Sequence, residues 1–260
     1  METALQSSQL TESDAMRTYK LTIAYDGSRF RGWQRQPDTD MTIQGILERD
    51  ISDYVGYKVE VNGSGRTDGG VHASGQTASI ILSGKVDEPV FLTEINEKIP
   101  EDIRIVNMEL AKNGFHARHS ARGKRYEYTI DTAEKADVFL RKYSFHYPEM
   151  INVKKMEKAI EYLRGSHDFA GFTDRPDEKS TTRRIYDIIV RQDGHSLRIE
   201  YTGSGFMYHM VRILTGTLLE IGSGRRSPES INEIIESGQR ADAGFLVPAS
   251  GLCLKEVFYK

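Results

Sequence analysis

Asp68 lies in a glycine-rich stretch, NGSGRTDGGVHASGQTASI at residues 62–80, with Arg66 two residues before it. Glycine adopts positive φ readily and lets another backbone or a bulky ligand come close. A tight turn needs an aspartate and a glycine, but it needs neither Arg66 nor a second Gly-Gly step. The stretch therefore leaves two interpretations of Asp68 open: a turn residue, or a carboxylate that a substrate can approach.

Arg212 is the second residue that invites a chemical interpretation, because it is the only formally charged residue in the run FMYHMVRILTGTLL of residues 206–219. Apolar residues recur there at helical spacing and predict a helix over 206–221, on which Tyr208 and Arg212 share a face. The arginine either extends along the surface until its head reaches water or is buried and pairs with a carboxylate, since an unpaired buried charge is costly. Asp68 is the candidate partner.

The segment AKNGFHARHSARGKR, residues 111–125, is basic although the chain has a formal net charge of −3. It holds five Lys or Arg and no acid, whereas residues 87–110 hold seven Asp or Glu against two Lys or Arg. Tyr126 and Tyr128 follow and share one face of a predicted strand. A solvated basic face with core tyrosines is one interpretation. The other is a site for looped RNA, in which Tyr126 stacks on a base or transfers a proton.

Two other kinds of site find little support. The Gly-Ser-Gly of residues 63–65 lacks the Gly-Lys-Ser/Thr of a P-loop and precedes a predicted strand, so no helix N-terminus is available for a phosphate. His116 and His119 lack a third ligand at a zinc-site spacing. A nucleotide-dependent enzyme is kept as a minor alternative, and we expect neither a cofactor nor a metal.

The pattern of residues predicts intermixed strands and helices. Without strict βαβ alternation, this order favours an α+β fold with a mostly antiparallel sheet, in two ferredoxin-like halves that meet near residues 109–123. The strands are expected at 18–25, 57–62, 75–82, 102–108, 124–131, 184–192, 195–202 and 252–259. The helices are expected at 42–55 behind a Thr42 cap, 88–98, 152–164, 206–221 and 227–237.

The composition is that of an ordinary globular protein, with 38% hydrophobic and 28% charged residues in a chain of 260. No apolar run is long enough for a transmembrane helix. Residues 1–17 are polar and acidic, unlike a secretion signal, and are expected to be a disordered extension. The single cysteine, Cys253, excludes an internal disulfide and fits a reducing, cytoplasmic compartment.

Asp68 and Arg212 belong to segments that resemble the tRNA pseudouridine synthase A family. Further segments follow the family order, and the resemblance extends over about residues 18–260. Gly70 stands where the family usually has alanine, and Ile213 where asparagine is frequent, which leaves the choice of substrate open. The segments are GRTDGGVHA (65–73), GFMYHMVR (205–212), AYDGSRFRGWQRQ (24–36), TIQGILE (42–48), FHARHSA (115–121), KRYEY (124–128), HDFAGF (167–172), TTRRI (181–185) and PASGLCL (248–254).

The resemblance implies a pseudouridine synthase fold with a central active-site cleft. Residues 18–110 would form a half that carries the catalytic aspartate, and residues 111–260 a half that carries a stacking tyrosine and the partner arginine. The implied reaction converts uridine to pseudouridine at positions 38, 39 and 40 of the tRNA anticodon stem-loop, without cofactor or metal. The resemblance also implies a cytoplasmic homodimer.

Carried over residue by residue, Asp68 matches the catalytic carboxylate and Arg66 the residue that helps to displace the target base. Tyr126 matches the tyrosine that stacks on the uracil, and Arg212 the partner of the aspartate. Whether the carboxylate attacks C1′ or C6 or assists removal of the 2′ proton stays open, and so does a non-catalytic RNA-binding protein of the same fold. Other RNA contacts are expected from Arg31, Gln34, His72, Arg118, Lys124, Arg125, Tyr208 and His209.

Overall fold

The computed structural model describes residues 15–175 and 180–259. Their strands are β1 (Met16–Tyr25), β2 (Asn62–Gly63), β3 (His72–Ser83), β4 (Ile103–Leu110), β5 (Gly123–Asp131), β6 (Phe145–His146), β7 (Gly165–Asp168), β8 (Thr182–Asp193), β9 (Ser196–Gly203) and β10 (Leu252–Phe258). Their α-helices are α1 (Ile43–Val55), α2 (Glu88–Lys98), α3 (Val153–Leu163), α4 (Met210–Gly222) and α5 (Ser230–Ser237). All of these strands belong to one sheet, in the order β4-β1-β3-β10-β5-β9-β8-β7, with β2 paired to β3 and β6 to β5.

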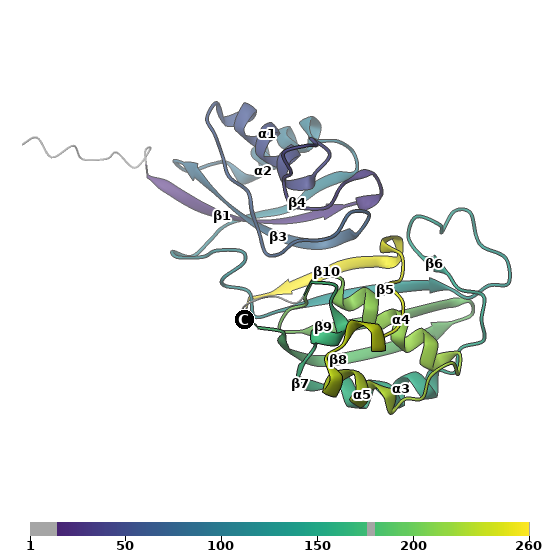
Figure 1. Cartoon of the computed structure of the whole chain (residues 1–260). Helices are drawn as coiled ribbons and strands as arrows, with labels where there is room; N and C mark the ends of the chain where they lie inside the picture. The colour runs from purple at the N-terminus through teal and green to yellow at the C-terminus, as the bar shows by residue number, and fades with distance from the viewer. Residues whose placement is uncertain (1–14, 176–179, 260) are drawn as a thin grey trace, which may run out of the picture.

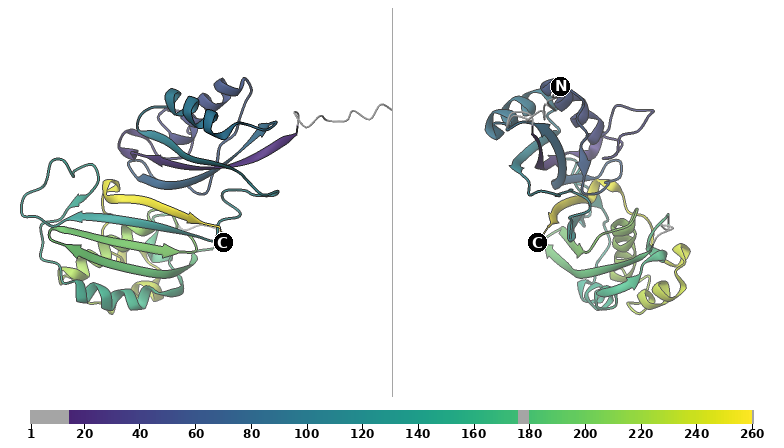
Figure 2. Two further views of the ribbon diagram at one scale, coloured as in Figure 1. Left: turned by 180° about the vertical axis from the view of Figure 1, so that it is seen from behind. Right: turned by 90° about the vertical axis from the view of Figure 1, so that its left-hand side faces the viewer.

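The sheet divides into two halves. Figure 1 shows β4, β1 and β3 with α1 and α2 above them, and β10, β5, β9, β8 and β7 with α3, α4 and α5 below. The halves share a short parallel pairing of Cys253 with His72 and Leu254 with Ala73, so the last strand of the chain lies beside β3 (Figure 2). Among the described residues the other pairings are antiparallel except that of β5 with β6. The predicted α+β fold with a mostly antiparallel sheet is confirmed.

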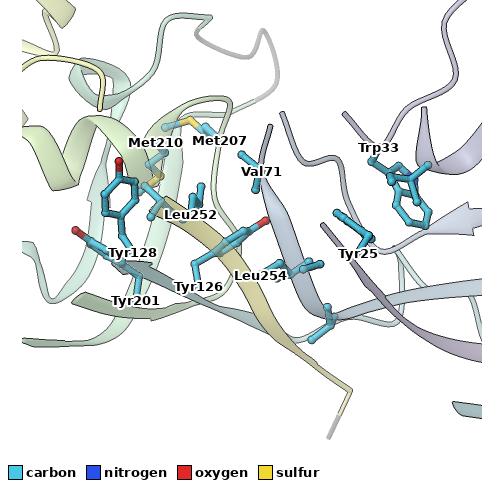
Figure 3. Packing of buried hydrophobic residues seen from close by; sticks show 14 of the residues in the cluster. Tyr25, Trp33, Val71, Tyr126, Tyr128, Tyr201, Met207, Met210, Leu252 and Leu254 are labelled. Atoms are coloured by element: carbon cyan, nitrogen blue, oxygen red, sulfur yellow. The ribbon is translucent and has the colours of Figure 1, made fainter. Parts of the chain in front are cut away.

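Apolar side chains pack where the halves meet. Tyr126 of β5 pairs with Leu254 of β10, and Val71, just before β3, approaches from the first half (Figure 3). Tyr126 is 7% exposed and Val71 2%. Burial of this surface on both sides stabilises the arrangement of the two halves, because apolar area removed from water is the main favourable contribution to packing.

Helix α4 is buried over most of its length, which explains its apolar sequence. The hydroxyls of Tyr201 on β9 and Thr215 on α4 lie 2.8 Å apart, and this hydrogen bond joins the helix to the sheet. A Cβ atom at Gly216 would lie 1.9 Å from the carbonyl oxygen of Phe245, so only glycine lets that segment cross the helix so closely. These contacts set the position of the first turn of α4, which carries Arg212.

The predicted strand at 57–62 is wrong except at its end. Only Asn62 of that range, together with Gly63, pairs with β3. The amide of Val59 donates to Oγ of Ser52, and the amide of Val61 donates to Oε1 of Glu48. Side chains of α1 therefore bind the backbone groups that a strand partner would otherwise bind.

The predicted helix over 206–221 begins four residues late, at Met210. His209 has a φ of 62°, in the left-handed region, and therefore cannot continue a right-handed helix. Tyr208 lies in the turn before the helix, so the expectation that Tyr208 and Arg212 share a helix face is wrong.

Strand β1 begins at Met16, so residues 16 and 17 of the expected disordered extension belong to the sheet. Ala15 is also described and accepts from the amide of Gly84 at 3.0 Å, whereas residues 1–14 of that extension lie outside the described residues. The division of the chain into halves 18–110 and 111–260 stays a prediction. Among the described residues no helix has both the length and the apolar character needed to cross a membrane.

Candidate active site

A cavity of about 670 Å³ is lined by residues of both halves. The first half contributes the loop of residues 63–68, and the second contributes β5 and the turn that leads into α4. The structure brings nine of the predicted site residues to this cavity, which we call the cleft. They are Gln34, Arg66, Asp68, Arg118, Lys124, Tyr126, Tyr208, His209 and Arg212.

The loop around Asp68 is held by its own backbone and by buried side chains. The hydroxyls of Tyr25 and Thr67 lie 2.9 Å apart, and the amide of Trp33 donates to the carbonyl of Thr67 at 3.1 Å. After Asp68 the chain turns, with the amide of Val71 donating to the Asp68 carbonyl at 3.2 Å. Gly70 has a φ of 81°, which favours glycine. Asp68 is therefore a turn residue by its backbone and a cleft residue by its side chain.

The predicted pairing of Asp68 with Arg212 is present in the structure. Nη1 of Arg212 donates to Oδ2 of Asp68 at 3.2 Å, and Nε of Arg212 donates to the carbonyl of Val247 at 2.8 Å. The arginine side chain is 12% exposed and the aspartate side chain 21%. Among the described residues no hydrogen bond reaches the other oxygen, Oδ1, of Asp68. The second half thus anchors one oxygen of a carboxylate that the first half presents.

Tyr126 contributes a ring to the cleft wall. Phe206 packs edge-on against it, with ring centroids 5.4 Å apart. Burial raises the pKa of Tyr126 far above its ordinary value, and the neighbouring Tyr25 and Asp68 raise it further. The phenol therefore stays protonated, which argues against Tyr126 as a base and leaves it as an apolar surface for stacking.

Basic side chains surround the cleft. Nε of Arg66 donates to Oε1 of Gln34 at 3.0 Å, and Nζ of Lys124 donates to the carbonyl of Ser64 at 3.1 Å. Burial lowers the pKa of Lys124 to about 8, and the charge of Arg118 contributes to this shift. Cationic and imidazole groups at a shared cavity suit a substrate with phosphate groups. His116, His119, Arg175 and Arg183 also line the cleft, although the prediction of RNA contacts did not include them.

Three of the residues expected to contact RNA do not line the cleft: Arg31, His72 and Arg125. His72 is buried: its Nδ1 accepts from the amide of Gly27 at 3.0 Å, and its Nε2 lies 2.8 Å from the carbonyl of Lys142. Arg125 lies 3.6 Å from Glu200 and 3.5 Å from Glu256, since successive residues of β5 point to opposite faces of the sheet. Arg31 is exposed, and its backbone lies beside Gly69, the residue after Asp68.

Two residues next to the cleft had no signal in the sequence. Nδ1 of His209 lies 2.5 Å from Oδ2 of Asp174, and Nε of Arg240 donates to Oδ1 of Asp174 at 2.8 Å. Asp174 follows the segment HDFAGF closely, but no spacing connects it with His209, 35 residues later.

The described residues contain no group of three or more His, Cys, Asp or Glu side chains placed to hold a metal ion. His116 and His119 stack on each other with ring centroids 4.4 Å apart. Desolvation lowers the pKa of His116, and the neighbouring His119 adds to this effect. His116 therefore offers an uncharged ring to the cleft near neutral pH.

Comparison with known proteins gives consistent matches. The family model described as tRNA pseudouridine synthase matches residues 21–120 and 159–260. The chain is 42% identical over 243 residues to tRNA pseudouridine synthase A 2 of Bacillus thuringiensis subsp. konkukian, covering 93% of this chain and 99% of that protein. It is 42% identical over 246 residues to tRNA pseudouridine synthase A 2 of Clostridium perfringens, covering 94% of this chain and 100% of that protein.

A chain of the solved Cbf5-Nop10-Gar1 complex aligns with 91% of this chain and 48% of its own length. The identity is 11% and the TM-score 0.37, a likeness too low to add to the sequence matches.

Proposed function

Since the chain belongs to the tRNA pseudouridine synthase family, we propose that Asp68 is its catalytic carboxylate and that its target is the tRNA anticodon stem-loop. Family membership establishes the reaction class, which is isomerisation of uridine to pseudouridine in tRNA. The identity of the reacting group, the RNA contacts and the position of the target uridine are the proposal.

The observation that supports Asp68 is the unequal environment of its two oxygens. Oδ2 is held by Arg212 at 3.2 Å, while Oδ1 has no hydrogen-bond partner among the described residues and belongs to a side chain that lines the cleft. The guanidinium fixes the orientation of the carboxylate. An ionised carboxylate is the form needed to attack C1′, to add to C6 or to take the 2′ proton.

The isomerisation breaks the N1–C1′ bond of uridine and forms a C5–C1′ bond after the uracil has rotated. C5 loses its proton and N1 gains one, so no oxidant, reductant or cofactor is needed. The protein must hold the detached base close to the ribose during this rotation. The ring of Tyr126, with Phe206 packed edge-on behind it, offers a flat apolar surface for that purpose.

The target base must first leave the RNA stack, which costs a few kcal/mol. Arg66 lies two residues before Asp68, and its contact with Gln34 holds it at the wall of the cleft. A guanidinium there can take the place of the displaced base and contact the adjacent phosphates. Lys124 and Arg118 add positive charge to the same cavity, so tRNA binding should weaken strongly with salt.

Modification at positions 38, 39 and 40, a homodimeric state and a cytoplasmic location are part of the same proposal. They rest on the family-like segments that extend over about residues 18–260. Gly70, in the turn after Asp68, has a φ of 81°, a conformation that favours glycine.

The test is release of tritium from tRNA labelled at C5 of uridine, together with mapping of pseudouridine in tRNA from cells lacking the protein. We expect label release by the parent protein and loss of pseudouridine from the anticodon arm in those cells. Tight tRNA binding without label release would instead indicate a non-catalytic RNA-binding protein. Label release with pseudouridine lost only outside the anticodon arm would contradict the proposed target.

A further inference from the structure

His209 lies between two carboxylates at the wall of the cleft. Its Nε2 atom is 3.6 Å from Oδ2 of Asp68, and its Nδ1 atom is 2.5 Å from Oδ2 of Asp174. The Asp68 oxygen that faces His209 is the same one that Arg212 contacts at 3.2 Å. Two nitrogen-bearing side chains therefore converge on one oxygen of the carboxylate proposed to react.

Asp174 is itself held from behind by Arg240. Nε of Arg240 donates to Oδ1 of Asp174 at 2.8 Å, and Nη1 of Arg240 donates to the carbonyl of Gly244 at 3.0 Å. Burial alone raises the pKa of Asp174, but the hydrogen bonds from His209 and Arg240 outweigh burial and hold that pKa below its ordinary value. Asp174 is therefore an anion at neutral pH and accepts the proton on Nδ1 of His209.

The backbone at His209 indicates that the ring position is imposed by its surroundings. Among the described residues, His209 is the non-glycine residue with positive φ, at 62°. Such a conformation is strained and persists where neighbouring contacts hold it. The ring of Tyr208 stacks on the His209 ring at 3.6 Å between centroids, and Oγ1 of Thr173 donates to the carbonyl of Tyr208 at 2.8 Å. Thr173 and Asp174 are adjacent, so one short segment binds both the backbone carbonyl of Tyr208 and the ring of His209.

We propose that Asp174, held by Arg240, is a positioning residue that fixes His209 against Asp68. The His209 ring then lies beside Oδ2 of Asp68, with Nε2 3.6 Å away, and limits the carboxylate to the position in which Arg212 contacts Oδ2 and Oδ1 is left to the substrate. The inference rests on the proposed function of Asp68. Asp174 acts through His209, so loss of Asp174 is expected to change the orientation of the Asp68 carboxylate. A displacement of a reacting group by about 1 Å can lower the rate on the order of 100-fold.

The test is steady-state and single-turnover kinetics of Asp174→Asn on tRNA. We expect kcat to fall by roughly 10- to 100-fold while KM stays within about twofold of the parent value. Arg240→Gln removes the support behind Asp174 and is expected to lower kcat less, in the same direction. A matched control is Asp187→Asn, because Asp187 also pairs with an arginine, Arg164 at 2.9 Å, but does not line the cleft. This control is expected to keep the parent kcat.

A double-mutant cycle separates positioning from general structural damage. If Asp174 acts through His209, adding Asp174→Asn to a His209→Gln protein causes no further loss of kcat. Nitrogen-15 NMR of the histidine ring supplies a direct readout, with a protonated Nδ1 in the parent and an altered Nδ1 resonance in Asp174→Asn. Should Asp174→Asn fail to fold, Arg240→Gln carries the same cycle.

Three results would overturn the inference: parent-like kcat in Asp174→Asn, a loss confined to KM, or fully additive losses in the double mutant. Parent protein that releases no tritium would overturn the proposed function instead. An active parent whose kcat survives Asp174→Asn would overturn this inference alone.

Discussion

The pairs Asp26–His72 and Asp68–His209 are alike in residue type and distance, yet they lie in different surroundings. Oδ1 of Asp26 is 3.2 Å from Nδ1 of His72, and Oδ2 of Asp68 is 3.6 Å from Nε2 of His209. Both aspartates are followed by glycine in the family-like segments, so residue types alone do not separate them. The difference lies in what their other polar atoms contact.

In the first pair, protein groups occupy the polar atoms. His72 uses one ring nitrogen for the amide of Gly27 and the other for the carbonyl of Lys142. Asp26 accepts from the amide of Ser28 at 2.9 Å and from the hydroxyl of Tyr143 at 2.9 Å. Because Lys142 and Tyr143 belong to the chain between β5 and β6, this cluster ties that loop to the first half.

In the second pair, one carboxylate oxygen keeps its capacity for a new contact. Oδ1 of Asp68 has no partner among the described residues, and the side chain lines the cleft. The Asp68 side chain is 21% exposed beside the cavity, so this oxygen is accessible to a ligand. The comparison teaches that a carboxylate oxygen without a protein partner, on a side chain that lines a cavity, distinguishes the candidate reagent from the structural pair, whereas the residue types do not.

The largest expected effect is that of Asp68→Asn. We expect kcat for tritium release to fall at least about 10³-fold, because asparagine lacks the anionic oxygen while keeping the shape of the side chain. Asp26→Asn is the matched control and should retain kcat within about twofold. Comparable losses in both variants would break the distinction between the pairs.

Arg212→Met is expected to lower kcat by roughly 100-fold, since Asp68 then loses the cation that anchors Oδ2. Binding of tRNA, measured by filter retention, should change little. Arg164→Met removes an arginine that pairs with Asp187 outside the cleft and should leave kcat near the parent value. Undiminished turnover in Arg212→Met would show that the anchored oxygen is irrelevant.

Lys124 is a cation that lines the cleft, and its ammonium donates a hydrogen bond to the backbone carbonyl of Ser64. Its pKa is lowered to about 8, first by burial. The ammonium is therefore charged below about pH 8 and neutral above it, so tRNA affinity should fall as pH rises through that range. Lys124→Met should bind tRNA roughly tenfold more weakly near neutral pH and show a flatter pH dependence. A variant with the parent pH profile would contradict the assignment.

His72→Gln tests the structural role of the first pair. We expect a decrease of about 1–2 kcal/mol in the free energy of unfolding in urea, since one of the two buried ring contacts is lost. Tritium release should keep its parent kcat. Loss of turnover in a stably folded His72→Gln protein would return His72 to the RNA-binding residues.

The smallest effect is the pH dependence of Asp26. Burial raises the pKa of its carboxyl, but the hydrogen bonds from Ser28 and Tyr143 outweigh burial and hold that pKa below its ordinary value. A carboxyl with a lowered folded pKa stabilises the protein above its unfolded pKa, about 4, and loses that contribution as pH falls through the folded pKa. Asp26→Asn should therefore reduce stability at neutral pH more than at about pH 3. An equal reduction at both pH values would argue against this contribution.

Several features were predictable because their signals are local or carry a strong physical requirement. Thr42 caps α1 as expected, with its hydroxyl accepting from the amide of Gly45. Of the two interpretations of the lone arginine in an apolar helix, the one with a carboxylate partner is confirmed, and Asp68 is that partner. The alternation in KRYEY correctly assigned Tyr126 and Tyr128 to one strand, β5.

Other features depended on residues far apart in the chain. Val59 and Val61 look like strand residues, but Ser52 and Glu48 of α1 bind their amides. His72 lies in the motif beside Asp68 and resembles a site residue. Its Nε2 atom, however, contacts the carbonyl of Lys142, 70 residues later. No local pattern reports such contacts.

The sequence by itself determined the reaction family, the α+β class and the pairing of an aspartate with a distant arginine. Those conclusions follow from motif order, from alternation and from the cost of an unpaired buried charge. Only the tertiary structure decided which histidine lies beside the Asp68 carboxylate and which one binds backbone groups with both ring nitrogens. The same structure brings Asp174 to His209 across 35 residues of chain and Arg240 to Asp174 across 66. The reason is that hydrogen bonding depends on which groups packing leaves near one another, and residue type alone does not contain that information.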